Sequence, residues 1–222
     1  MRKLFLIMMA LMLMPSLCSA SLVELEGAKT SFEKSDSWID ISSQIFVKEG
    51  IKVYGYQIDD DDVLLINIHE SVDKKFNNIA QVPDRQEFAK LYAEGMKKGE
   101  HGAINIIEFG SKKIGNTEWI LTNYTIKKNG ETLYVRGFFT VNHWKEITFS
   151  FHYLSKEAFE QNEEKDLRIM NSVVTRQEPT KKEMNTHVDS ATKSRTYGNY
   201  FFYFIIFISV IVLFVRQYKK NT

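Results

Sequence analysis

The chain has 222 residues and a balanced charge, with 29 lysines and arginines against 28 aspartates and glutamates. Its one cysteine, Cys18, lies close to the N-terminus, so a mature chain without that segment can hold neither a disulfide nor a thiol-based metal site. Residues 21–177 carry 25 acidic and 20 basic side chains, and this acidic surplus argues against nucleic acid as a partner.

Residues 1–20 have the parts of a secretory signal peptide. Basic residues near the start are followed by an apolar run over residues 4–14 and by the small residues Cys18-Ser19-Ala20. We expect cleavage after Ala20. The alternative is lipoprotein processing at Cys18, which the bulky Leu17 disfavours because that position normally holds a small residue.

The first part of the mature chain reads as strands. A short strand or a packed lead-in segment is indicated near residues 38–41, and residues 45–57 are predicted to form a strand, a turn and a second strand. Val63–His69 is apolar with little alternation, which predicts a strand covered on both faces. The run Asp59–Asp62 between these strands could bind Ca²⁺, but it lacks the alternating ligands and the glycine of an EF-hand loop. We interpret it as an acidic turn.

Two helices are predicted. The first runs over residues 84–99, behind a capping box formed by Asp84 and Glu87. The second runs over residues 156–174, behind the N-cap Ser155. We expect the charged side chains of this closing helix to face water: Glu160, Glu163, Glu164, Lys165 and Asp166.

Strands fill the segment between the two helices. Residues 103–109 form the first, ending at Gly110, and the next two flank the hairpin signal Asn129-Gly130. The last, residues 146–153, alternates cleanly, so the three consecutive strands form an antiparallel meander. We expect one apolar face shared by its two final strands: Leu133, Val135, Phe139, Val141, Ile147, Phe149, Phe151 and Tyr153.

This order of strands, helix, four strands and a long closing helix predicts an α+β fold with helices packed on an antiparallel sheet. The meander and the ending YLSKEAFEQNEEKDLRIMNSV, Tyr153–Val173, resemble the PsbP-like family, which includes bacterial DcrB-like periplasmic proteins. The resemblance implies an α/β/α sandwich. It also implies a non-catalytic role in binding or assembly, because most members of that family have such roles.

The last part of the chain predicts a membrane anchor. Residues 178–197 are polar and aperiodic, as in a flexible linker. Tyr200–Val215 contains no charge, and residues 198–216 are long enough to cross a hydrocarbon core of about 30 Å as a helix. A buried core helix is the alternative, but it would show a polar face, and only Ser209 interrupts the run. The remaining residues 217–222 form a cytoplasmic tail.

The two ends together predict a single-pass membrane protein whose domain, residues 21–177, lies in the periplasm. We expect a non-catalytic binding or assembly module with a protein partner in the cell envelope and no cofactor. The alternative is a cell-envelope enzyme or metal-binding protein that uses carboxylates and histidines. No pair of the domain's histidines has the spacing of a helical zinc site: His69, His101, His143 and His152.

The outward face of the meander is the candidate partner surface, because it mixes aromatic side chains with single polar groups. Its side chains are Trp119, Asn123, Tyr134, Arg136, Phe138 and His152, of which we select Trp119, Asn123, Arg136 and His152. The alternative is that helices cover this face. If the surface binds a partner, Arg136→Ala and Trp119→Ala should abolish partner capture with little change in melting temperature.

Overall fold

The computed structural model describes residues 20–45, 50–60, 62–71, 76–99, 104–128 and 130–176. The predicted signal peptide up to position 19, the linker 178–197, the membrane helix 198–216 and the tail 217–222 lie outside the described residues. Within the described part, no helix is both long and apolar enough to cross a membrane.

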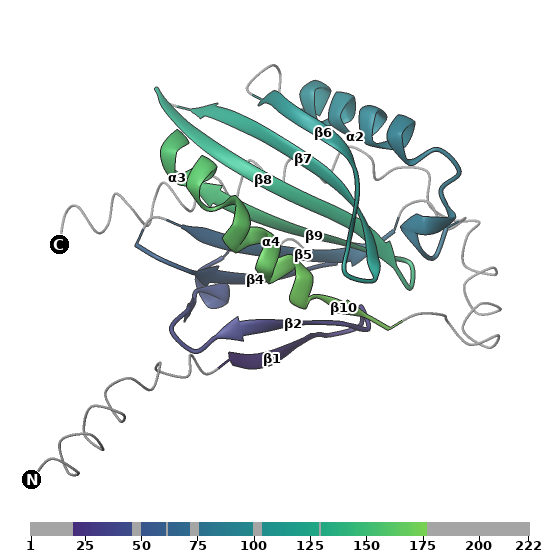
Figure 1. Ribbon diagram of the computed structural model, residues 1–222, viewed down its shortest axis with the longest axis horizontal. Helices are drawn as coiled ribbons and strands as arrows, with labels where there is room; N and C mark the ends of the chain where they lie inside the picture. The colour runs from purple at the N-terminus through teal and green to yellow at the C-terminus, as the bar shows by residue number, and fades with distance from the viewer. Residues whose placement is uncertain are drawn as a thin grey trace, which may run out of the picture.

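An antiparallel seven-stranded sheet forms the centre of the molecule (Figure 1). Its strand order is β3-β4-β5-β9-β8-β7-β6, so the meander β6 to β9 pairs through β9 with β5. The strands are β3 (Ile39–Asp40), β4 (Ile51–Gln57), β5 (Val63–Glu70), β6 (Ile104–Ile114), β7 (Thr117–Lys128), β8 (Glu131–Asn142) and β9 (Lys145–Tyr153). The predicted meander is therefore confirmed, and β5 is a central strand with neighbours on both sides.

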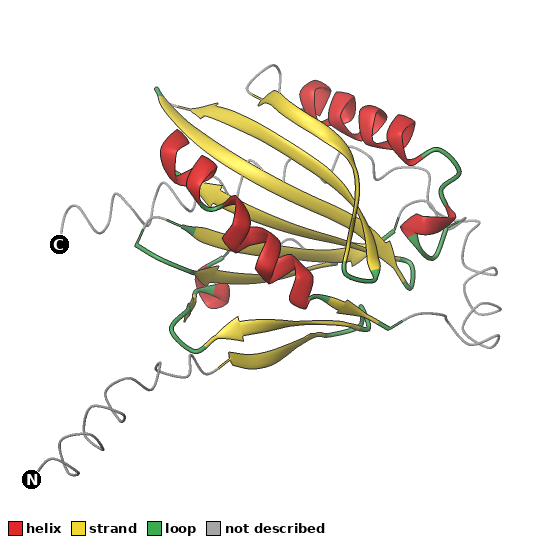
Figure 2. Ribbon diagram, in the orientation of Figure 1, coloured by secondary structure: helices red, strands yellow, loops and turns green. Residues whose placement is uncertain are grey.

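Within the described residues, a smaller three-stranded sheet, ordered β1-β2-β10, and three α-helices accompany the large sheet (Figure 2). The small sheet consists of β1 (Ala20–Leu25), β2 (Thr30–Ser35) and β10 (Val174–Thr175). The helices are α2 (Arg85–Gly99), α3 (Lys156–Gln161) and α4 (Glu163–Ser172), with 3-10 turns η1 (Ser42–Gln44) and η2 (Ile79–Gln81).

The helices lie on both faces of the large sheet. On one face Met96 of α2 packs in a buried cluster with Ile126 of β7 and Val135 of β8. On the other face Met170 of α4 packs in the main core cluster with Phe149 of β9, beside residues of β1 and β2. This is the α+β, α/β/α arrangement that the sequence resemblance implies.

The register of β8 and β9 corrects one predicted face. Phe138 lies opposite Phe149, whereas Val135 lies opposite His152, and directly opposed residues of antiparallel strands point to the same side of a sheet. The residues predicted to share one face therefore divide between two, with Leu133, Val135, Phe139 and Val141 under α2 and Ile147, Phe149, Phe151 and Tyr153 under α4. Both faces of β8 are buried, so its apolar residues do not identify a single inner side.

The β6 strand is longer than predicted. It continues in extended backbone through Gly110 as far as Ile114 and then turns through Gly115-Asn116 into β7. Gly115 has φ of 59°, a left-handed conformation that glycine adopts without steric cost. The chain therefore turns at Gly115, while Gly110 is an ordinary strand residue.

Both predicted helix starts are confirmed by their caps. The backbone N–H of Glu87 donates to Asp84 Oδ1 at 2.9 Å, and that of Ala158 donates to Ser155 Oγ at 3.1 Å. The closing helix is not continuous, because the chain leaves helical geometry at Asn162 (φ −90°, ψ 7°) between α3 and α4.

Candidate functional site

The residues of the candidate partner surface are buried. Trp119 is 0% exposed, His152 2%, Arg136 3% and Asn123 8%. Trp119 belongs to the main core cluster, and Arg136 contacts α3 and α4, so these covering elements leave no open recognition face here. His152 points to the opposite side of the sheet, beside Val135, and the structure does not bring it together with the other three. The prediction of an exposed surface is therefore wrong for these four residues, and the alternative, that helices cover this face, is confirmed where α3 and α4 contact Arg136.

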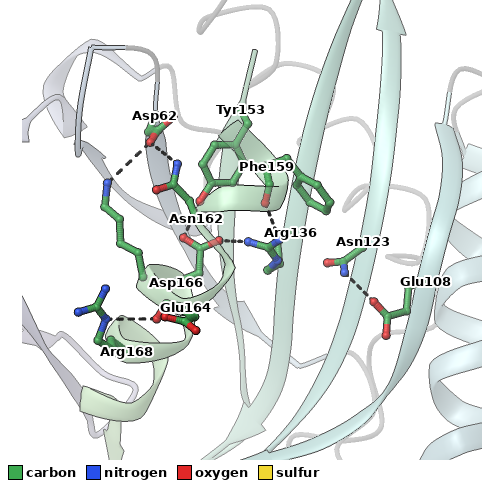
Figure 3. A network of polar contacts seen from close by, with 11 residues as sticks. Asp62, Glu108, Asn123, Arg136, Tyr153, Phe159, Asn162, Glu164, Asp166 and Arg168 are labelled. Carbon is green, nitrogen blue, oxygen red and sulfur yellow. Dashed lines mark hydrogen bonds and ion pairs between the residues drawn. The ribbon is translucent and has the colours of Figure 1, made fainter. Parts of the chain in front are cut away.

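Arg136 instead lies at the centre of a buried polar network (Figure 3). Its Nη1 forms an ion pair with Asp166 of α4, and its Nη2 donates to the carbonyl oxygen of Phe159 at 2.7 Å. The Tyr153 hydroxyl donates to the second Asp166 oxygen at 2.5 Å. The guanidinium carbon also lies 4.4 Å from the centre of the Phe159 ring. The network thus joins β8 and β9 to both helices of the closing segment.

The buried environment raises the pKa values of the Asp166 carboxyl and the Tyr153 hydroxyl. Burial raises the pKa of Asp166 to about 6, although the Tyr153 hydroxyl and the Arg136 guanidinium both lower it. Burial, and then the charge of Asp166, raises the pKa of Tyr153 well above its usual range. Arginine stays charged at any physiological pH. The arrangement therefore suits permanent pairing around one carboxylate more than proton transfer to a substrate.

An outer set of contacts ties the acidic turn to α4. Asn162 Nδ2 donates to Asp62 Oδ2 at 3.1 Å, and the Lys165 ammonium pairs with Asp59 and lies 3.7 Å from Asp62 Oδ2. The Lys165 ammonium thus partly neutralises the acidic turn, which was the possible calcium site in the sequence. Asp61 of this turn lies outside the described residues. The described residues contain no group of three or more histidines, cysteines or carboxylates that could hold a metal.

The described histidines are dispersed. His69 Nε2 lies 3.3 Å from Glu146 Oε2, His143 lies in the turn between β8 and β9, and His152 lies near the far end of β9. His101 lies outside the described residues. These positions give the alternative of a histidine-based metal enzyme no support from the described part of the chain.

Asn123 lies on the same face of the sheet as Arg136, directly opposite it in the β7–β8 register. Its Nδ2 donates to Glu108 Oε2 of β6 at 2.8 Å (Figure 3). Asn123 therefore joins two strands of the sheet and orients a carboxylate at the sheet's outer strand.

Asp166 lies on the buried side of α4, contrary to the prediction from the sequence. It was expected to face water, yet its side chain is 0% exposed. The spacing held a signal, because Asp166 precedes Met170 by four residues and Val173 by seven, and both of these are buried. Its charge suggested a solvent-facing position, whereas its place on the helix indicated the sheet-facing side.

His152 should make stability depend on pH. Burial lowers the pKa of His152 to about 3, while an unfolded histidine titrates near about 6.5. Below that pH the unfolded chain binds a proton that the folded chain excludes, so stability present above pH ~6.5 is lost as the pH falls towards ~3.

Between pH 7 and pH 5 we expect the wild type to lose about 2 kcal/mol of unfolding free energy more than His152→Gln loses. Urea unfolding of both proteins at the two pH values measures this difference, and the subtraction removes the contribution of other titrating groups, including Asp166. Parallel profiles would contradict a buried neutral histidine.

Comparison with known proteins identifies the fold. No protein-family model and no curated protein matches the sequence. Among solved structures, the cyanobacterial PsbP protein (CyanoP) from Synechocystis superposes with a TM-score of 0.55 at 14% identity, over 72% of this chain and 95% of that chain. The similarity to CyanoP shows a PsbP-like fold, which confirms the predicted resemblance at the level of the fold.

Two further structures align over similar lengths. The Ran-binding protein Mog1p from Saccharomyces cerevisiae has a TM-score of 0.44 at 12% identity, over 71% of this chain and 96% of that chain. LpqN, involved in cell envelope biogenesis of Mycobacterium tuberculosis, has a TM-score of 0.44 at 10% identity, over 70% of this chain and 90% of that chain.

Proposed function

We propose that this chain, which has a PsbP-like fold, is a non-catalytic binding or assembly module held at the outer side of a bacterial cytoplasmic membrane. The secretory signal sequence places the domain outside, and the helix over residues 198–216 anchors it. The partner is another protein of the cell envelope. No cofactor takes part.

The observation that supports this proposal is that the buried polar side chains bond to one another within the domain. Asp166 and Tyr153 are the titratable groups of this network, but each is buried and bonded to another member of it. A general acid or base must come within hydrogen-bond reach of its substrate, whereas these groups lie in contact with α3 and α4 and bond to one another. The large apolar side chains that stay exposed on the described strands suit binding instead: Leu22, Ile39, Ile107, Phe109 and Val174.

Crosslinking in intact cells tests the function. The full-length chain should remain in the membrane after a carbonate wash, and its domain should be digested by protease added on the periplasmic side. Crosslinking followed by purification should recover a specific envelope protein. A chain ending at residue 197 is the matched control, and it should be released from the membrane and lose most of the crosslinked product.

Two results would contradict the proposal. Release of the full-length mature chain by a carbonate wash would show that residues 198–216 do not anchor it in the membrane. Stoichiometric Zn²⁺ or Ca²⁺ in the purified protein, together with turnover of an envelope substrate, would favour the alternative of a metal-dependent enzyme.

A further inference from the structure

The outer edge of β6 is open in the described structure. β6 ends the strand order of the large sheet and pairs only with β7 among the described strands. Its side chains are largely exposed, including Ile107 at 51% and Phe109 at 38%. The register of β6 with β7 shifts between Ile106 and Glu108, so the regular part of this edge is Glu108–Ile114, whose backbone donors and acceptors form a row to which another strand can add.

The charged residues of β6 are complementary to those of a second β6 strand that runs antiparallel to it. Edge lysines normally oppose pairing, and β6 carries Lys112 and Lys113. Glu108, however, lies four residues before Lys112 and on the same face, because these two residues pair with Asn123 and Trp119 of β7. An antiparallel copy of the strand can therefore set each of these charges against its opposite.

We propose that β6 pairs antiparallel with β6 of a second copy of this chain, about a two-fold axis that passes through Gly110. In this register Glu108 lies opposite Lys112 of the second copy, Phe109 opposite Ser111, and Gly110 opposite itself. The symmetry of the dimer repeats the Glu108–Lys112 pair, and opposite charges placed directly across an antiparallel pair stabilise it. The two large sheets become one continuous sheet.

The charges select this register over its neighbours. A two-fold axis through Phe109 would place Glu108 opposite Gly110, and an axis through Ser111 would place Glu108 opposite Ile114. Both alternatives lose the two ion pairs. A side chain is also acceptable on the proposed axis, because a Cβ added at Gly110 would meet only the side-chain oxygen of Gln86, at 3.8 Å.

Charge reversal tests the pairing in the full-length chain, purified in detergent and measured by sedimentation over a range of concentrations. The wild type should form dimers. Lys112→Glu should weaken dimerisation about tenfold, because it places like charges opposite each other twice. The double variant Glu108→Lys/Lys112→Glu should restore it. Lys113→Glu is the matched control, since it makes the same charge change at the next residue, away from Glu108, and should leave the dimer intact.

Cysteine pairs test the register independently, in a Cys18→Ser background. Opposed residues of an antiparallel pair have Cα atoms about 4.5–5.5 Å apart, within the range of a disulfide. Gly110→Cys should therefore crosslink to its own copy. Lys112→Cys alone should not, because the two positions lie about 13 Å apart along the strands. A mixture of Lys112→Cys and Glu108→Cys chains should crosslink.

Several outcomes would overturn the inference. They are a monomer at every concentration, a dimer unaffected by Lys112→Glu, a charge swap that fails to restore a Lys112→Glu defect, or a disulfide formed by Lys112→Cys alone. The second of these would assign dimerisation to another surface. The inference does not rest on the proposed envelope partner, so either result leaves the crosslinking test of function intact.

Discussion

Replacing Arg136 by alanine should lower the free energy of unfolding by about 3–5 kcal/mol, because it leaves the buried Asp166 carboxylate without its charged partner. The substitution also removes the hydrogen bond to the Phe159 carbonyl oxygen and the contact with the Phe159 ring. For a chain of this size, the melting temperature should fall by roughly 10 °C. Urea and thermal unfolding of the purified protein measure both quantities.

The matched control is Arg136→Met combined with Asp166→Asn, which replaces the pair by neutral side chains of similar size. It should recover a large part of the stability, since the cost of the single substitution comes mainly from an unpaired buried charge.

The loss of unfolding free energy in Arg136→Ala should also be smaller at pH 5 than at pH 8. The pKa of Asp166 is about 6 and rises further without Arg136, so the stability held by its protonated form is lost as the pH increases.

A loss below about 1 kcal/mol in Arg136→Ala would contradict the structural role, because substitutions of exposed residues usually stay within that range. If partner capture disappeared in such a stable variant, Arg136 would belong to a binding surface after all. The structure leads us to expect the reverse, with capture declining only as the folded population declines.

Trp119→Ala should cost about 3–5 kcal/mol, as other large-to-small substitutions of buried aromatic residues do. The indole is fully buried and makes edge contacts with Phe138 and Phe149, at ring-centre distances of 6.5 and 5.7 Å. Its removal opens a cavity between the large sheet and the elements that cover it. Chemical unfolding followed by far-UV circular dichroism measures the loss.

Trp119→Phe serves as the comparison for this position. It keeps an aromatic ring and removes an indole nitrogen that has no hydrogen-bond partner among the described residues. We expect it to cost much less than the alanine variant. Equal, small effects of both substitutions would show that Trp119 is exposed in solution, contrary to the structure.

The sequence predicted the elements whose signals are local. Capping residues located the starts of α2 and α3, and Asn129-Gly130 located the hairpin between β7 and β8. The strands β1 and β2 were missed, because Ala20–Leu25 and Thr30–Ser35 are short and their polar residues obscure the alternation. Their structure depends on contacts with β10 and the main core, which are distant in the sequence.

The polar network could not be predicted because it depends on tertiary contacts. An arginine between aromatic residues of a strand has the composition of a recognition surface, and only the packing of α3 and α4 shows that Arg136 is covered. The separation of Asn123 and Arg136 from His152 likewise depends on the register of three strands. The residue types showed correctly that these positions are polar. They did not show on which face of the sheet each side chain lies or how deeply it is buried.

The bonding of Lys165 and Asp166 limits how α4 can move. These neighbours project about 100° apart around the helix axis, one towards the acidic turn and the other towards Arg136. Rolling the helix in either direction would break one of the two attachments before it improved the other. The Arg136–Asp166 pair is buried and the Lys165–Asp59 pair is largely exposed, so a rotation of α4 that keeps the buried pair and breaks the exposed one costs the least.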